Sequence, residues 1–133
     1  MNDVNAAIGL ANLQEVDKNV ILKHKVNAHF YNEQLKDVKG VTLLENKVGY
    51  DSSYWIYTIK VERQDAFMRM MQQKGIMVSR VHERNDKHSC VSEFKVSLPN
   101  LDKIVNQMIC IPVGWWVTKQ EREYIVNSIK EGW

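Results

Sequence analysis

The sequence has few of the residues that mark secreted or membrane proteins. Its 133 residues include two cysteines, Cys90 and Cys110, which are too few for a disulfide framework. No stretch approaches the roughly 20 apolar residues of a membrane span, and the first five residues lack the basic and apolar regions of a signal peptide. We therefore expect a reduced, cytoplasmic protein that has no membrane partner.

An excess of one charge is also missing. The 18 basic and 16 acidic residues leave a formal net charge of +2. Nucleic-acid-binding domains usually carry a strong basic excess on one face, so we expect no nucleic-acid partner. The content of 44% hydrophobic and 26% charged residues is ordinary for a globular protein, and the length suits a single domain over residues 1–133.

Proline is scarce, and both prolines, Pro99 and Pro112, lie in the last third of the chain. The N-terminal part can therefore form one long helix, which the apolar spacing predicts from residue 3 to about 36. Asn2 or Asp3 can cap its start, and Gly40 follows its end.

The apolar residues of this helix recur at intervals of three and four, which predicts a buried stripe. The stripe consists of Ala6, Leu10, Leu13, Val16 and Val20, and it continues on a shifted face through Leu22, Val26 and Phe30. His24 and His29 lie among polar neighbours, and we expect them at the surface.

The rest of the chain alternates strands with helices. The patterns predict strands at 41–45, 54–61, 76–81 and 109–113, and helices at 64–74, 100–108 and 118–130. Thr118 and Glu121 form a capping box at the start of the last helix. This order predicts an α/β fold, specifically an α+β two-layer sandwich in which helices cover a small mixed or antiparallel sheet.

The stretch from Ser79 to Cys90 is the most chemically dense part of the sequence. Its candidate donors to phosphate or sugar hydroxyls are Arg80, His82, Arg84, Asn85 and His88. A solvated loop without a ligand is the alternative. The spacing of His82, His88 and Cys90 lacks the close ligand pairs of zinc sites, so we predict no metal there and no catalytic residue.

Several short sequence motifs resemble, in order and spacing, those of the DegT-type sugar aminotransferases. They are Met1–Gly9, Tyr31–Leu35, Ser53–Tyr57, Gly75–Ile76, Leu98–Asp102, Ile111–Gly114 and Thr118–Lys130. The resemblance implies the aspartate-aminotransferase fold and a pyridoxal-phosphate-dependent transfer of an amino group, typically from glutamate, to a nucleotide-linked keto sugar. It implies that this chain is the small C-terminal domain of such an enzyme.

The resemblance also implies what the chain lacks. The Schiff-base lysine, the aspartate under the pyridine nitrogen and the stacking aromatic belong to a large domain upstream, so we expect no cofactor-binding residue here and no activity alone. Residues 80–88 would face the active-site cleft. Asn2 and Asp3 would lie at its edge near a dimer partner, or would serve only as helix caps. Dehydratases of the same family remain an alternative to aminotransferases.

A second hypothesis is a free-standing α/β binding or regulatory module that acts as a homodimer. The adjacent Trp115 and Trp116 leave three roles open: covering the core, contacting the large domain or lining a substrate edge. If the helix stripe and the tryptophans lack a cover, their apolar surface promotes self-association, and we expect a dimer or larger species.

Overall fold

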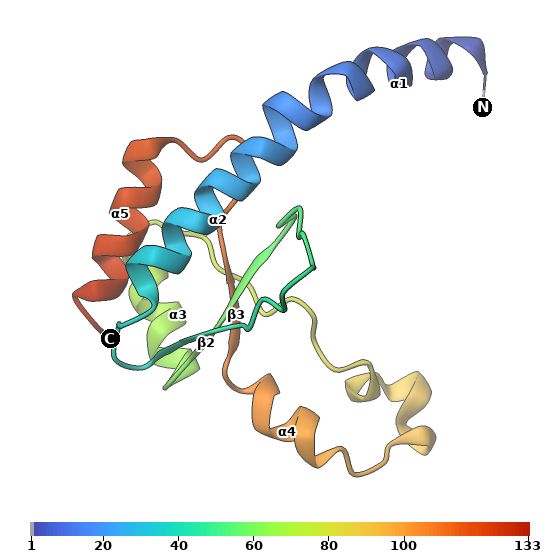
Figure 1. The fold of residues 1–133 in the computed structure, drawn as a ribbon. Coiled ribbons are helices and arrows are strands. Elements are labelled where there is room, and N and C mark those ends of the chain that lie inside the picture. The colour runs from blue at the N-terminus through green and yellow to red at the C-terminus, as the bar shows by residue number, and fades with distance from the viewer. Residues whose placement is uncertain (1) are drawn as a thin grey trace.

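The computed structural model describes residues 2–133 as a long helix followed by a small sheet and its covering helices (Figure 1). The elements are α1 (Asp3–Glu15), η1 (Val16–Ile21), α2 (Leu22–Leu35), β1 (Val41–Leu43), β2 (Tyr57–Val61), α3 (Gln64–Gln73), η2 (Asn85–Lys87), η3 (Ser89–Phe94), α4 (Pro99–Val105), β3 (Met108–Ile111) and α5 (Lys119–Lys130). The predicted α/β class, with helices covering a small sheet, is confirmed.

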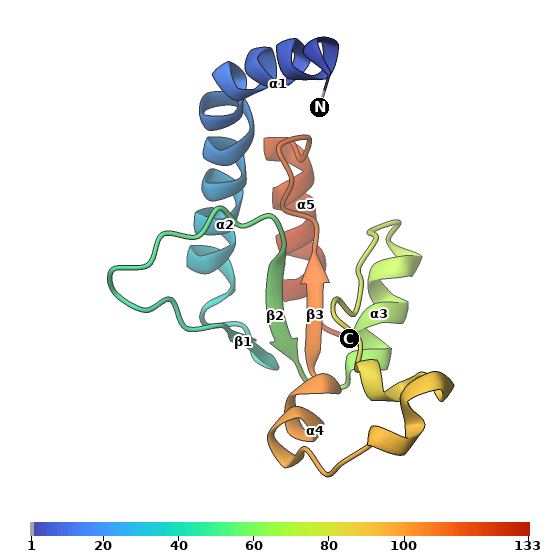
Figure 2. The same cartoon turned by 90° about the vertical axis from the view of Figure 1, so that its right-hand side faces the viewer.

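The sheet is antiparallel throughout, in the order β1-β2-β3. Val41 pairs with Val61 at one side of the central strand, and Ile59 pairs with Ile109 at the other. Buried and half-buried residues alternate along β2, so one face of the sheet carries the core and is covered by helices. α2 and α5 pack against each other beside this sheet (Figures 1 and 2).

The core brings together residues from α2, the sheet, α3 and α5. Its fully buried side chains include Tyr31, Leu35, Ile59, Phe67, Met71, Ile109 and Ile129. On α3, Phe67 and Met71 face this core, and Cys110 on β3 is buried as well. The capping box at α5 is present as predicted, with Thr118 and Glu121 each bonding the other's backbone N–H.

The long N-terminal helix forms as predicted, and the Asn2 side chain caps it by accepting a 2.9 Å hydrogen bond from the Asn5 N–H. The predicted burial of its apolar stripe is wrong for most of its residues, although Phe30 packs half-buried against the core. No residue of α1 is buried, and Leu22 and Val26 are 55% and 46% exposed. The π-helical turn η1 contains more residues than an α-helical turn. It therefore rotates the residues that follow, and a different face of α2 meets the core. Ala28, Tyr31 and Leu35 are buried instead.

His24 is buried, which contradicts its predicted place at the surface, while His29 is exposed as expected. The His24 ring nitrogen Nδ1 lies 2.9 Å from the Tyr54 carbonyl oxygen, and the ring meets Trp116 edge-on. A carbonyl can only accept, so Nδ1 carries the proton in this pair.

The predicted strand at 76–81 does not form. Only Ser79 pairs with the sheet, through an isolated bridge to Cys110. Met77 is 85% exposed, and the Arg80 side chain turns to Asp65 on α3. Ile76 is nevertheless buried in the core, and Val78 packs against it.

Candidate substrate-binding segment

The segment from Arg80 to His88 leaves the sheet at a fixed point. The Ser79 N–H donates to the Cys110 carbonyl over 3.1 Å, and the Cys110 N–H donates back over 2.8 Å. Beyond this pair of hydrogen bonds the chain has no strand or α-helix until α4, and it runs through the short 3₁₀ turns η2 and η3. The sheet thus sets where the segment begins, and its own side chains determine its course.

Arg84 organises the segment from within. Its Nε donates to Asp86 Oδ1 over 2.7 Å, its Nη2 donates to the other oxygen of the same carboxylate, and its Nη1 donates to Asp102 on α4. These bonds raise the pKa of Arg84 and lower the pKa of Asp86, mainly through their mutual side-chain hydrogen bonds. With most of its donors used inside the chain, Arg84 ties the segment to α4.

Arg80 is also engaged within the chain, because its guanidinium pairs with Asp65 on α3. Its Nε is buried without a hydrogen-bond partner among residues 2–133. Both arginines of the segment are therefore held by carboxylates, and neither is a free anion receptor in this arrangement.

The remaining three candidates present their side chains outward. His82, Asn85 and His88 are all exposed. The His82 ring lies near the Trp55 ring, with centroids 6.1 Å apart, and His82 and Arg80 help to line a cavity of about 50 Å³ beside α4. Imidazole and amide groups can donate to or accept from hydroxyl groups, so these side chains are suited to hold a polar ligand.

Asn2 and Asp3 lie far from this segment. They stand at the free end of α1, whereas η2, η3 and α4 lie at the opposite end of the molecule (Figures 1 and 2). The Asn2 side chain is used in capping the helix, and Asp3 is an exposed acid in the first turn, where the helix dipole favours it. The structure therefore does not bring the two groups of candidate residues together within one chain.

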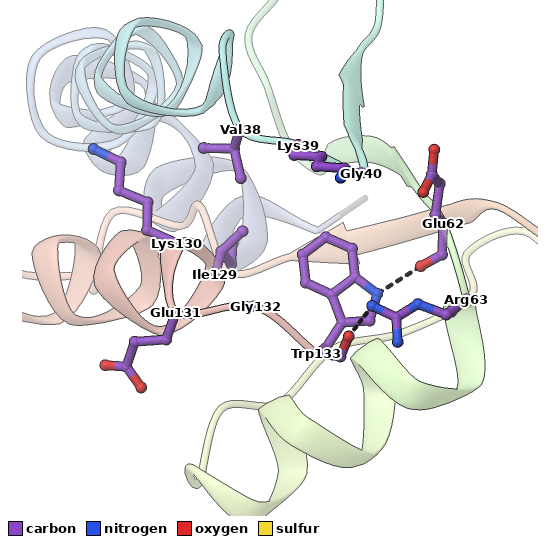
Figure 3. A pocket seen from close by; sticks show the side chains of 10 residues that line it. All are labelled: Val38, Lys39, Gly40, Glu62, Arg63, Ile129, Lys130, Glu131, Gly132 and Trp133. Carbon is purple, nitrogen blue, oxygen red and sulfur yellow. Dashed lines mark hydrogen bonds between the residues drawn. The ribbon is translucent and has the colours of Figure 1, made fainter.

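A cavity of about 460 Å³ at the C-terminal end of α5 is lined by none of these residues. Figure 3 shows the Trp133 indole standing in it, where its Nε1 donates to the Glu62 carbonyl over 2.6 Å and Arg63 donates to the Trp133 carbonyl. The indole also meets Phe67 edge-on and lies against Gly40, whose φ of +82° needs glycine. The polar groups that surround the indole are paired with one another, so we interpret this pocket as closure of the core.

Sequence reasoning missed a buried polar network at the other end of α5. The Asn27 amide donates to three carbonyls, those of Val113, Gly114 and Val117, and its oxygen accepts from Arg122. Together these bonds fix the loop that carries Trp115 and Trp116. An asparagine among polar helix neighbours gave no signal of this role in the sequence.

Within residues 2–133, no group of three or more potential metal-binding side chains comes together. None of the helices in this part of the chain is long and apolar enough to cross a membrane.

The whole length of the chain matches known proteins. Residues 1–130 match the DegT/DnrJ/EryC1/StrS aminotransferase family. The chain belongs to this family. A crystal structure of AtS13 from Actinomadura melliaura is 46% identical with a TM-score of 0.95 over 100% of this chain. That of the sugar aminotransferase CalS13 from Micromonospora echinospora is 41% identical with a TM-score of 0.94, also over 100% of this chain.

The family members are much longer than this chain. The matched region is 35% of AtS13 and 36% of CalS13. The dTDP-4-amino-4,6-dideoxy-D-glucose transaminase of Shigella dysenteriae is 26% identical over 98% of this chain, which corresponds to 38% of that protein. The chain therefore spans little more than a third of the length of the relatives that it matches.

Proposed function

We propose that this chain is the small C-terminal domain of a pyridoxal-phosphate-dependent enzyme that transfers an amino group from glutamate to a nucleotide-linked keto sugar. The observation that supports it most is the unbroken likeness to the sugar aminotransferase CalS13, which covers 100% of this chain at 41% identity. A large domain of the same enzyme is its proposed partner, and a dimer is the proposed assembly.

The cofactor would be held by that large domain. Pyridoxal phosphate needs a lysine enclosed beside it, and every lysine in residues 2–133 is exposed or half-buried. Two of the half-buried lysines are paired with acids, Lys25 with Asp51 and Lys74 with Glu131. The residues of this chain do not fit the cofactor, and we assign it none of the chemical steps.

The proposed task of this chain is to hold the sugar nucleotide. His82, Asn85 and His88 would contact the ligand because they are exposed and carry hydrogen-bonding groups. Arg80 and Arg84 would position the segment through Asp65 and Asp102. Asp3 would reach the edge of an active site in the assembled enzyme, while Asn2 caps the helix that presents it.

A chimera tests this proposal. The matched third of CalS13 is replaced by this chain, and amino transfer from glutamate is measured as 2-oxoglutarate formed with nucleotide-linked keto sugars. The chimera should fold after this replacement because the two structures superpose with a TM-score of 0.94. We expect transaminase activity, and we expect His82→Ala or His88→Ala to raise KM for the sugar nucleotide by about tenfold, the loss of roughly one good hydrogen bond.

The matched control is His29→Ala, because His29 is exposed on α2. It should leave KM unchanged. A folded chimera that forms no 2-oxoglutarate with any of the nucleotide-linked keto sugars would contradict the proposal. Both Cys90 and Cys110 are free thiols, which is consistent with the cytoplasmic location that we propose.

A further inference from the structure

Helix α1 is rich in apolar residues, but its large apolar side chains are exposed in the structure. It projects beyond the sheet and the other helices in both views (Figures 1 and 2). Val4, Ile8, Leu10 and Leu13 are 67%, 56%, 65% and 67% exposed. A helix of this length is marginal by itself in water, and in most proteins a helix is stabilised by packing an apolar face.

These four residues form two stripes rather than one. Val4 and Ile8 are four positions apart and share a side of the helix. Leu13 comes nine residues after Val4, which is about two and a half turns at 3.6 residues per turn, and so lies on the opposite side. Helices that are apolar all round are buried in larger proteins. A single flat neighbour covers one side only, so the two stripes indicate that α1 is enclosed.

A second apolar feature, the Gly114-Trp115-Trp116 loop, is held rigidly although it is exposed. The Trp116 ring lies directly against Gly114, where any side chain would overlap it, and it meets His24 edge-on. The Asn27 amide fixes the backbone beneath. Yet Trp115 and Trp116 are 50% and 63% exposed, and Trp116 borders a cavity of about 310 Å³ with Met77 and Tyr124.

Preorganised, exposed tryptophans beside a pocket are typical anchors of protein interfaces. Trp116 also contacts His24, which lies on α2 close to the point where the long helix leaves the body of the domain. The loop thus contacts α2, which η1 separates from α1 along the same long helix. We name the set Val4, Ile8, Leu10, Leu13, Trp115 and Trp116 the junction surface.

The length of the relatives identifies what covers it. AtS13 matches all of this chain with a TM-score of 0.95, so the arrangement of α1 relative to the domain is kept in a protein of which this chain is only 35%. We propose that the junction surface is the docking face for the remaining part of the aminotransferase, which encloses α1 on both sides and receives Trp116. This inference rests on the proposed function and names the contact that it requires.

The test compares the free chain with the CalS13 chimera by hydrogen exchange and thermal unfolding. In the free chain the α1 amides should exchange rapidly, because the helix has no tertiary cover, and in the chimera they should exchange at least about tenfold more slowly. Leu13→Lys should lower the Tm of the chimera by at least about 2 °C and leave that of the free chain unchanged within about 1 °C. Trp116→Ser should lower the Tm of the chimera by at least about 2 °C more than that of the free chain, which loses only the contacts of Trp116 with Gly114 and His24.

Phe94→Ser in η3 is the control for Trp116→Ser, because Phe94 is similarly exposed at 70% but lies outside the junction surface. It should change both Tm values equally or not at all. Equal α1 exchange in the free chain and the chimera would overturn the proposal. So would a free-chain dimer that Leu13→Lys converts to monomer while the chimera is unaffected, because a second copy would then be the occupant. Neither readout depends on transaminase activity, so an inactive but protected chimera refutes only the proposed reaction.

Discussion

Arg122 on α5 donates a hydrogen bond of 3.1 Å from Nη1 to Oδ1 of Asn27 on α2, which joins two residues 95 positions apart. The same guanidinium lies 4.7 Å from the centre of the Phe30 ring. Because the Asn27 amide also holds three carbonyls of the loop between β3 and α5, one buried side chain connects the two helices and the Gly-Trp-Trp loop. This network fixes the position of α5 relative to α2.

Asn27→Ala should therefore be strongly destabilising. The substitution leaves buried carbonyls and part of the Arg122 guanidinium without partners, and each unsatisfied buried group costs about 1–3 kcal/mol. We expect the free energy of unfolding to fall by about 2–3 kcal/mol, measured by urea denaturation followed by circular dichroism. Asn12→Ala on α1 is the matched control, since Asn12 is exposed. Equal losses for the two variants would refute the role of the network.

Substitution of Arg84 should loosen the segment between residues 80 and 98 without lowering the stability of the whole domain. Arg84→Lys keeps the charge but cannot make the forked bond to Asp86 while also reaching Asp102. We expect cleavage between residues 80 and 98 by a limiting amount of protease to become about tenfold faster, with little change in Tm. Arg69→Lys, at an exposed position on α3, is the control. An unchanged cleavage rate for Arg84→Lys would show that the segment is ordered by other contacts.

Local signals in the sequence predicted those elements that local chemistry determines. The Thr118 and Glu121 side chains exchange bonds with each other's backbone within one turn, so the start of α5 is encoded within four residues. The aromatic and β-branched run around Tyr57 and Ile59 likewise gave the central strand, although the strand begins three residues later than predicted. Gly40 marked the end of the helical segment through its left-handed φ.

The failures depend on contacts between distant residues. The apolar spacing predicts that the stripe continues on a shifted face through Val26, but the π turn of η1 brings another face of α2 to the core, so Tyr31 is buried and Val26 is not. The buried position of His24 depends on the Tyr54 carbonyl, 30 positions away, which accepts a hydrogen bond from its ring. For the candidate segment, no spacing revealed that Asp102 on α4 would hold Arg84.

The two buried tyrosines make stability sensitive to alkali. Burial raises the pKa of Tyr31 and of Tyr57 well above the ordinary value of 10.0. Their hydroxyls donate to the Pro112 carbonyl over 2.8 Å and to Asn32 over 2.6 Å. In the unfolded chain both ionise near their ordinary pKa, whereas in the folded chain they stay protonated. Their contribution to stability is thus complete below about pH 10 and is lost progressively above it.

Urea midpoints measured between about pH 8 and pH 11 test this sign. We expect the free energy of unfolding to fall above pH 10 by up to about 1.4 kcal/mol per pH unit for each tyrosine. Tyr31→Phe should lower stability at neutral pH, by about 1 kcal/mol for the lost hydrogen bond, and should reduce the alkaline slope. Tyr50→Phe should alter neither, because Tyr50 is 81% exposed. A wild-type stability that stays flat to pH 11 would contradict the buried, protonated state.

Glycine-to-alanine substitutions at two positions should act in opposite directions. Gly9 lies inside α1 with nothing within 4 Å of the place that a Cβ would take, whereas a Cβ at Gly114 would overlap the Trp116 ring. Gly9→Ala should therefore raise the helicity of α1, because glycine costs a helix interior about 0.5–1 kcal/mol relative to alanine. Gly114→Ala must displace the indole, and the strain should lower the free energy of unfolding by about 1–3 kcal/mol.

Far-ultraviolet circular dichroism and hydrogen exchange at α1 measure the first effect, and tryptophan emission with urea denaturation measures the second. The emission of Gly114→Ala should shift in wavelength or intensity, because Trp116 leaves its contact with His24. Gly9→Ala should leave emission unchanged and so serves as the control for Gly114→Ala. If Gly114→Ala kept both the emission and the stability of the wild type, the indole would not be held against Gly114 in solution. Trp116 would then not be held in a fixed position, and the argument that it serves as an interface anchor would fail.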